Sequence, residues 1–146
     1  MRIAGQPSSG VWSVDVGVDP EAARHKAMPN QALVRQFHRL FGYDVNDGPT
    51  KRTMQEQDFR YSLIREEYME LRAELQHVYP DVAAVAHEAA DLMYVLYGLA
   101  CELGFDLDAC FREVHRANMS KDRAAEGKAI KGDRFVPANI EGVING

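Results

Sequence analysis

Cysteine is scarce in this sequence, and two other common features are absent. Only Cys101 and Cys110 occur in 146 residues, too few for the disulfide framework of a small secreted domain, and their spacing fits no zinc-binding pattern. No apolar run approaches the length of a membrane-spanning helix, and the N-terminal residues do not contain the apolar core of a signal peptide. We therefore expect a cytoplasmic protein without a membrane partner.

Positive charge is also in short supply. Lys and Arg total 17 against 22 Asp and Glu, which gives a formal net charge of −5 at pH 7. A protein that coats nucleic acid normally presents a basic field, so we expect no nucleic-acid polymer as a partner. Nucleotide monomers are not excluded, because a local group of Lys and Arg is enough to bind them.

The residues that are present predict an all-α protein. Helical spacing of apolar residues indicates helices at about 31–41, 53–78, 81–103 and 107–120, with Asn30 and Asp106 as N-caps and Gly42 and Gly104 as stops. The short connections favour an antiparallel four-helix bundle. We divide the chain into a short N-terminal arm at 1–28, a helical domain at 29–121 and an irregular basic tail at 122–146.

The arm and the tail each leave alternatives open. Residues 11–19 alternate Val with small or acidic residues, which is a strand pattern. Such a strand either pairs with a second copy of the chain, lies across the helices or has no fixed structure. The tail has no helical period and carries Arg123, Lys128, Lys131 and Arg134. It is either a solvated terminus or a flap that closes over a site.

Acidic residues interrupt the apolar faces of the second and third predicted helices. They are Glu66, Glu67, Glu70, Glu88 and Asp91. The first three continue the stripe that contains Phe59 and Leu63, and the last two share a stripe with Leu92 and Val95. Each stripe is expected to face a core. The acids therefore lie where a helix normally packs against its neighbours.

Carboxylates on a core-facing stripe need compensation, because ionised groups away from water require pairing, hydrogen bonds or a metal ion. Several acids that converge without an equal number of bases repel one another. A hard divalent cation with oxygen ligands removes this repulsion, and Mg²⁺ or Mn²⁺ suits a site made only of carboxylates. The alternative is that each acid forms an ordinary surface ion pair with a base one helical turn away.

The two acidic motifs resemble a known signature. Glu66-Glu67-x-x-Glu70 followed by Glu88-x-x-Asp91 is similar to the EExxE…ExxD pattern of the all-α nucleoside triphosphate pyrophosphohydrolases, which include MazG, the dimeric dUTPases and phosphoribosyl-ATP pyrophosphohydrolase. The later segments 115–121 and 127–132 resemble the Asn-x-x-Lys segment and Lys-rich tail of single-domain MazG-like enzymes. This resemblance implies a four-helix MazG-like catalytic domain and two or more Mg²⁺ ions per site, which Mn²⁺ can replace.

The resemblance also implies roles for individual residues. Metal ligands are expected at Glu67, Glu70, Glu88 and Asp91. Either Glu66 or Glu67 is expected to act on the attacking water.

Contacts with the substrate are predicted on other helices. Asn118 and Lys121 extend the inward stripe of the fourth helix, so they and Lys128 are the expected phosphate contacts; a solvated last turn is the alternative. His38 lies near the apolar face of the first helix and is either a packing residue or a contact to a nucleobase.

The implied reaction is cleavage of a nucleoside triphosphate to the monophosphate and pyrophosphate, with dUTP narrowly ahead of dGTP. A phosphoribosyl-ATP pyrophosphohydrolase-like enzyme is the alternative. Two other classes are considered: a di-iron bundle, which needs Glu-x-x-His pairs that are absent here, and a non-catalytic helical interaction module. The resemblance further implies a homodimer or a dimer of dimers, because Met93, Tyr94 and Tyr97 cannot all face the same core as Glu88 and Leu99.

Overall fold

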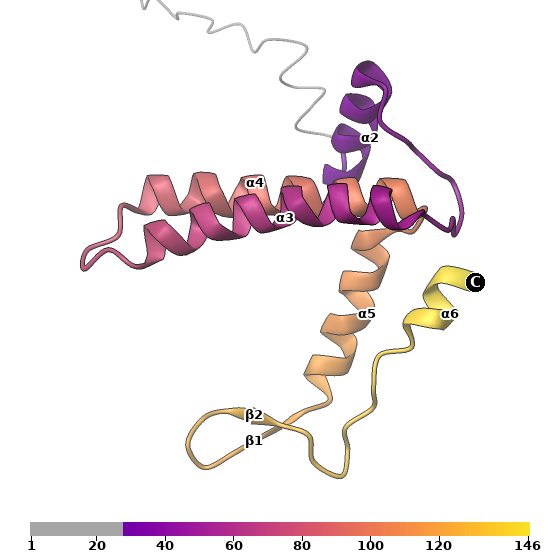
Figure 1. The fold of residues 1–146 in the computed structure, drawn as a ribbon. Helices are drawn as coiled ribbons and strands as arrows, with labels where there is room; N and C mark the ends of the chain where they lie inside the picture. The colour runs from indigo at the N-terminus through magenta and orange to yellow at the C-terminus, as the bar shows by residue number, and fades with distance from the viewer. Residues whose placement is uncertain (1–27) are drawn as a thin grey trace, which may run out of the picture.

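The computed structural model describes residues 28–146 and confirms the all-α class (Figure 1). Its helices are α2 (Asn30–Phe41), α3 (Met54–Leu75), α4 (Val82–Leu103), α5 (Leu107–Met119) and the short α6 (Ile140–Asn145). The strands in this part of the chain, β1 (Asp122–Arg123) and β2 (Ala129–Ile130), form a small antiparallel hairpin. The strand predicted at residues 11–19 lies outside the described residues.

Side-chain caps fix where three of the helices begin. Thr53 and Glu56 form a reciprocal capping box at the start of α3. Asp81 accepts a hydrogen bond from the backbone N–H of Ala83 at the start of α4, and Asp106 does the same for α5. The predicted cap at Asp106 and the predicted stops at Gly42 and Gly104 are confirmed.

Two predicted helix ends are wrong. Asn30 does not cap α2, because the carbonyl of Pro29 already accepts hydrogen bonds from the N–H groups of Ala32 and Leu33 and Asn30 is the first helical residue. The second predicted helix was extended to residue 78, but α3 ends at Leu75. The residues that follow form the turn that leads into α4.

The helices α3 and α4 lie side by side as an antiparallel pair, and α2 and α5 meet that pair at one end only (Figure 1). The buried apolar cluster is at that end and consists of Val34, Tyr97 and Cys101, with Leu107 packed against it. The other half of the α3–α4 pair extends beyond α2 and α5. The prediction that four helices of one chain enclose the acids in their interior therefore needs correction.

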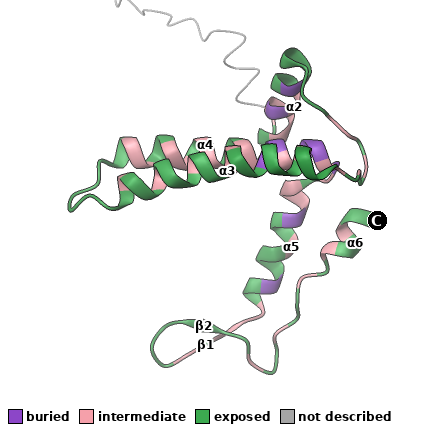
Figure 2. Cartoon of the chain, viewed as in Figure 1, coloured by how far each residue is buried: buried purple, intermediate pink, exposed green. Residues whose placement is uncertain are grey.

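Much of the apolar surface of this pair is uncovered (Figure 2). Arg60 is the single buried residue of α3, and the buried residues of α4 all lie between Tyr97 and Glu102. Contrary to the sequence expectation, α4 is long and apolar enough, by length and composition alone, to cross a membrane, and only 11% of its most apolar stretch is buried.

The tail is mostly irregular, as predicted, but it also contains α6, which was not predicted. Four hydrogen bonds attach it to α5 and to Ser120, the residue that follows this helix. Glu113 accepts from the N–H of Asn139 at 2.8 Å, Arg116 donates to the carbonyl of Pro137 at 2.9 Å, Ser120 accepts from the N–H of Val136 at 2.9 Å, and its hydroxyl donates to the carbonyl of Val136 at 3.4 Å. The α6 helix is thus held along α5.

Candidate metal centre and adjoining groove

Three of the five predicted acids converge at the uncovered half of the α3–α4 pair. Glu67 and Glu70 on α3 and Glu88 on α4 each direct a carboxylate oxygen to a point where these oxygens lie within 4.8 Å of one another. Glu67 and Glu70 are neighbours because residues three apart share a helix face, and the antiparallel pairing brings Glu88 opposite them. Glu67 and Glu88 are partly buried and Glu70 is exposed.

The electrostatics of this cluster show that its charges are not balanced. Burial raises the pKa of Glu67, and the nearby charges of Glu70, Asp91, Glu66 and Glu88 raise it further. Burial also raises the pKa of Glu88. The charge of Glu70 and a hydrogen bond between the Glu70 and Glu88 carboxyl groups raise it further. A cluster of neighbouring carboxylates without an equal number of bases is one that a cation would stabilise.

The donor set suits a hard divalent cation. All the converging atoms are carboxylate oxygens, and Mg²⁺ and Mn²⁺ prefer such ligands. No histidine or thiol belongs to the cluster, which fits neither a zinc site nor the predicted alternative of a di-iron bundle. The residues present therefore fit the metal that the sequence predicts.

Asp91 and Glu66 lie beside the cluster without belonging to the converging set. Asp91 contributes to the raised pKa of Glu67 and of Glu88, and its Oδ2 lies 3.2 Å from Nε2 of His87. His87 was not predicted as a site residue. Its i, i+4 spacing to Asp91 was the available indication, since such residues share a helix face.

The predicted phosphate contacts are not brought to the acids of the same chain. Asn118 ends α5, Lys121 follows it and Lys128 is exposed in the hairpin, all on the part of the chain that leaves the α3–α4 pair. Within residues 28–146, no hydrogen bond or ion pair joins their side chains to the cluster. Their contact with phosphate stays a prediction.

His38 faces inward. Only 2% of its surface is exposed, its Nδ1 lies 3.0 Å from the carbonyl oxygen of Asp44, and its Nε2 points at Gly98. A side chain this deeply buried packs against α4 and does not present its ring to solvent. The geometry favours the packing role over the predicted contact with a nucleobase.

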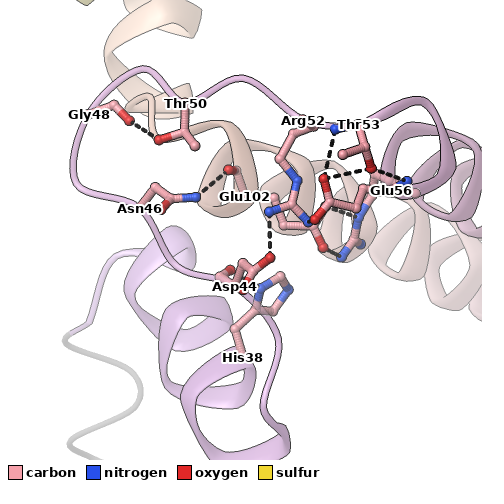
Figure 3. A network of polar contacts seen from close by, with 10 residues as sticks. His38, Asp44, Asn46, Gly48, Thr50, Arg52, Thr53, Glu56 and Glu102 are labelled. Carbon is pink, nitrogen blue, oxygen red and sulfur yellow. Dashed lines mark hydrogen bonds and ion pairs between the residues drawn. The ribbon is translucent and has the colours of Figure 1, made fainter.

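A buried ionic network next to His38 was not predicted (Figure 3). Arg60 on α3 and Glu102 on α4 are each 4% exposed, and the guanidinium binds both carboxylate oxygens, with Nε to Oε2 at 3.1 Å. Arg52 pairs with Asp44 and lies 3.6 Å from Glu56. The sequence did contain an indication, because Arg60 and Glu102 carry opposite charges on the two stripes that face each other.

A pocket of about 750 Å³ lies over this network. Its walls come from the start of α3, the end of α4 and the preceding loop, and include Lys51, Arg52, Tyr61, Ile64 and Leu99. Ile64 is one helical turn from Glu67, and Leu99 shares the stripe of Glu88. The pocket therefore begins about one helical turn from the acid cluster along α3.

Comparison with known proteins gives one match. No curated protein matches the chain. The family model described as phosphoribosyl-ATP pyrophosphohydrolase matches residues 34–118, which is more than half of the chain and contains both acidic motifs. Its residues run from the first turns of α2 to near the end of α5, the segment that contains the acid cluster and most of the pocket lining. The chain therefore belongs to the phosphoribosyl-ATP pyrophosphohydrolase family, within the all-α nucleoside triphosphate pyrophosphohydrolases, and its activity is of the nucleotide pyrophosphohydrolase type.

Proposed function

We propose that this protein hydrolyses a deoxynucleoside triphosphate to the monophosphate and pyrophosphate with the help of Mg²⁺. The observation that carries the proposal is the convergence of Glu67, Glu70 and Glu88, whose carboxylate oxygens lie within 4.8 Å of one another. Polyphosphate needs a cation between it and such a cluster, because anionic oxygens on both sides would otherwise repel. The adjoining pocket gives the nucleoside a place next to the phosphates.

The carboxylates divide into two roles in this proposal. Glu67, Glu70, Glu88 and Asp91 hold the metal, which when bound neutralises phosphate charge and lowers the pKa of water. Glu66 lies outside the converging set and is free to take the proton from the attacking water; Glu67 is the alternative acceptor. The water oxygen bonds to the α-phosphorus, the bond from that phosphorus to the bridging oxygen breaks, and pyrophosphate leaves with the electron pair.

The spacing of residues along α3 suggests how the substrate lies. From Arg60 at the floor of the pocket to Glu67 the helix rises by seven residues, or about 10 Å, which is comparable to the length of a nucleoside. With the phosphates at the acids, the base reaches the side chains of Tyr61 and Lys51 in the pocket. These residues replace His38 as the proposed contacts to the base.

We favour dUTP, with dGTP next. Phosphoribosyl-ATP is a second candidate substrate, because the matching family carries that name. The test is a parallel assay of dUTP, dGTP, dCTP, dTTP, dATP and phosphoribosyl-ATP with Mg²⁺, in which monophosphate and pyrophosphate are both measured. Preference for one base together with equimolar pyrophosphate supports the proposal. Release of orthophosphate alone, or retention of activity in Glu70→Gln, contradicts it; Glu141→Gln on α6 is the matched control.

A second copy of the chain is the proposed partner. Phe59, Tyr61 and Tyr68 on α3 and Met93 and Tyr94 on α4 are all more than a third exposed, although their side chains are large and mostly apolar. Exposed apolar surface of this extent is typical of a subunit interface. We propose a homodimer or a dimer of dimers. For Lys121 and Lys128 to contact phosphate, the hairpin must either move toward the acid cluster of its own chain or reach the acid cluster of the other subunit.

A further inference from the structure

The guanidinium of Arg60 contacts both Glu102 and the backbone of α4. Arg60 donates through Nε and Nη2 to the two oxygens of Glu102, and its Nη1 lies 3.4 Å from the carbonyl oxygen of Val95. The planar guanidinium therefore contacts α4 at two levels about two turns apart. Such a fork is directional and tolerates little sliding of one helix along the other.

Apolar packing does little to fix the position of α3 along α4. The buried apolar cluster joins α2 to α4, whereas the only buried residue of α3 is Arg60 itself. Partly buried residues such as Leu63 and Ile64 line the contact but are not enclosed. A helix held mainly by a half-exposed apolar stripe can shift at small cost, so a directional contact decides its register.

Gly98 makes room for this contact. A Cβ at position 98 would lie 2.5 Å from Nη1 of Arg60 and 3.1 Å from Nε2 of His38. The first distance is too short for a methyl group and the second is tight, so a side chain at this position would displace the guanidinium. The absence of a side chain at Gly98 thus allows Arg60 to reach between α3 and α4.

We propose that Arg60, Glu102 and Gly98 set the register of α3 against α4 and thereby position Glu67 and Glu70 opposite Glu88. The proposal rests on the metal centre proposed above. Arg60 precedes Glu67 by two helical turns on the same face, so a shift at the ion pair moves the carboxylates by the same amount. Metal ligands need a fixed separation, and loss of a supporting contact typically weakens metal binding about 10–100-fold.

The experiment measures Mn²⁺ binding to the full chain by electron paramagnetic resonance, without nucleotide, so that contact of Arg60 with substrate plays no part. The first variant is Arg60→Met with Glu102→Leu, in which apolar side chains of similar size replace a buried ion pair. Such replacements are often neutral or stabilising. The matched control is Arg35→Met with Asp47→Leu, which removes an ion pair at the surface. Thermal unfolding in EDTA is recorded for each protein.

We expect the Arg60/Glu102 variant to unfold at a temperature near that of the wild type and to bind Mn²⁺ at least about tenfold more weakly. The control is expected to bind Mn²⁺ as the wild type does. A folded Arg60/Glu102 variant with wild-type affinity would overturn the proposal.

If the double variant fails to fold, Gly98→Ala decides the matter. It keeps both charges but forces the guanidinium aside, and we expect a similar loss of Mn²⁺ affinity. Wild-type affinity in a folded Gly98→Ala protein would overturn the proposal equally. A wild-type protein that binds no Mn²⁺ would instead refute the metal centre itself, and the register proposal with it.

Discussion

Replacing Glu70 by Gln tests the acid cluster through stability as well as through activity. Two unit charges 4.8 Å apart repel by about 1 kcal/mol in a medium like water. Because Glu70 is exposed to water, its repulsion with Glu67 is expected to be close to this value of about 1 kcal/mol. Without metal, the substitution removes that repulsion, and for a domain of this size about 1 kcal/mol corresponds to a rise of about 4 °C in melting temperature.

The pH dependence has a defined sign. The folded-state pKa values of Glu67 and Glu88 are raised above the unfolded value, mainly by burial. Their contribution to stability is therefore fully present below the unfolded pKa and is lost as pH rises through the folded pKa. Metal-free wild type should gain stability as pH falls toward the ordinary pKa of a glutamate, and Glu70→Gln should gain less because one source of the raised pKa is gone.

The assay is calorimetric unfolding of both proteins at pH 5 to 8, first in EDTA and then with increasing Mg²⁺. A ligand that binds only the folded state raises stability with its concentration. We expect Mg²⁺ to raise the melting temperature of the wild type and to have little effect on the variant. The reasoning is refuted if Glu70→Gln is less stable than the wild type in EDTA, or if Mg²⁺ stabilises both proteins equally.

Three further predictions follow from the same structure. Asp91→Asn should lower turnover at least about tenfold, since a proposed metal ligand loses its charge; a change of less than threefold in pyrophosphate release would exclude Asp91 from the site. Sedimentation at micromolar concentration should show a dimer or larger species, and a monomer would leave the exposed face of α4 unexplained. Hydrogen bonds from Arg116 and from the N–H of Asn139 lower the pKa of Glu113 to about 2, so its stabilising effect exists above the unfolded pKa and is lost as pH falls toward 2. Glu113→Gln should flatten the acid side of the stability curve, and an unchanged curve from pH 5 to 2 would contradict this.

Much of the local structure could be predicted because it depends on residues close in sequence. The stops at Gly42 and Gly104 and the cap at Asp106 are properties of a few neighbouring residues. The same holds for the helical spacing that places Glu67 and Glu70 on one face. The predicted N-cap of α2 was wrong by one residue, because Pro29 and not Asn30 occupies the cap position, where its carbonyl accepts the first hydrogen bonds of the helix.

The sequence by itself determined the all-α class, the main helices and the placement of Glu67 and Glu70 on one helix face, because each depends on helical periodicity and on local capping. Only the tertiary structure decided that His38 is buried, that Arg60 pairs with Glu102, and that α5 carries Lys121 away from the acids of its own chain. These outcomes depend on the angles and register between helices. Such quantities are set by contacts between residues distant in sequence, and the helical period of a single segment does not contain them.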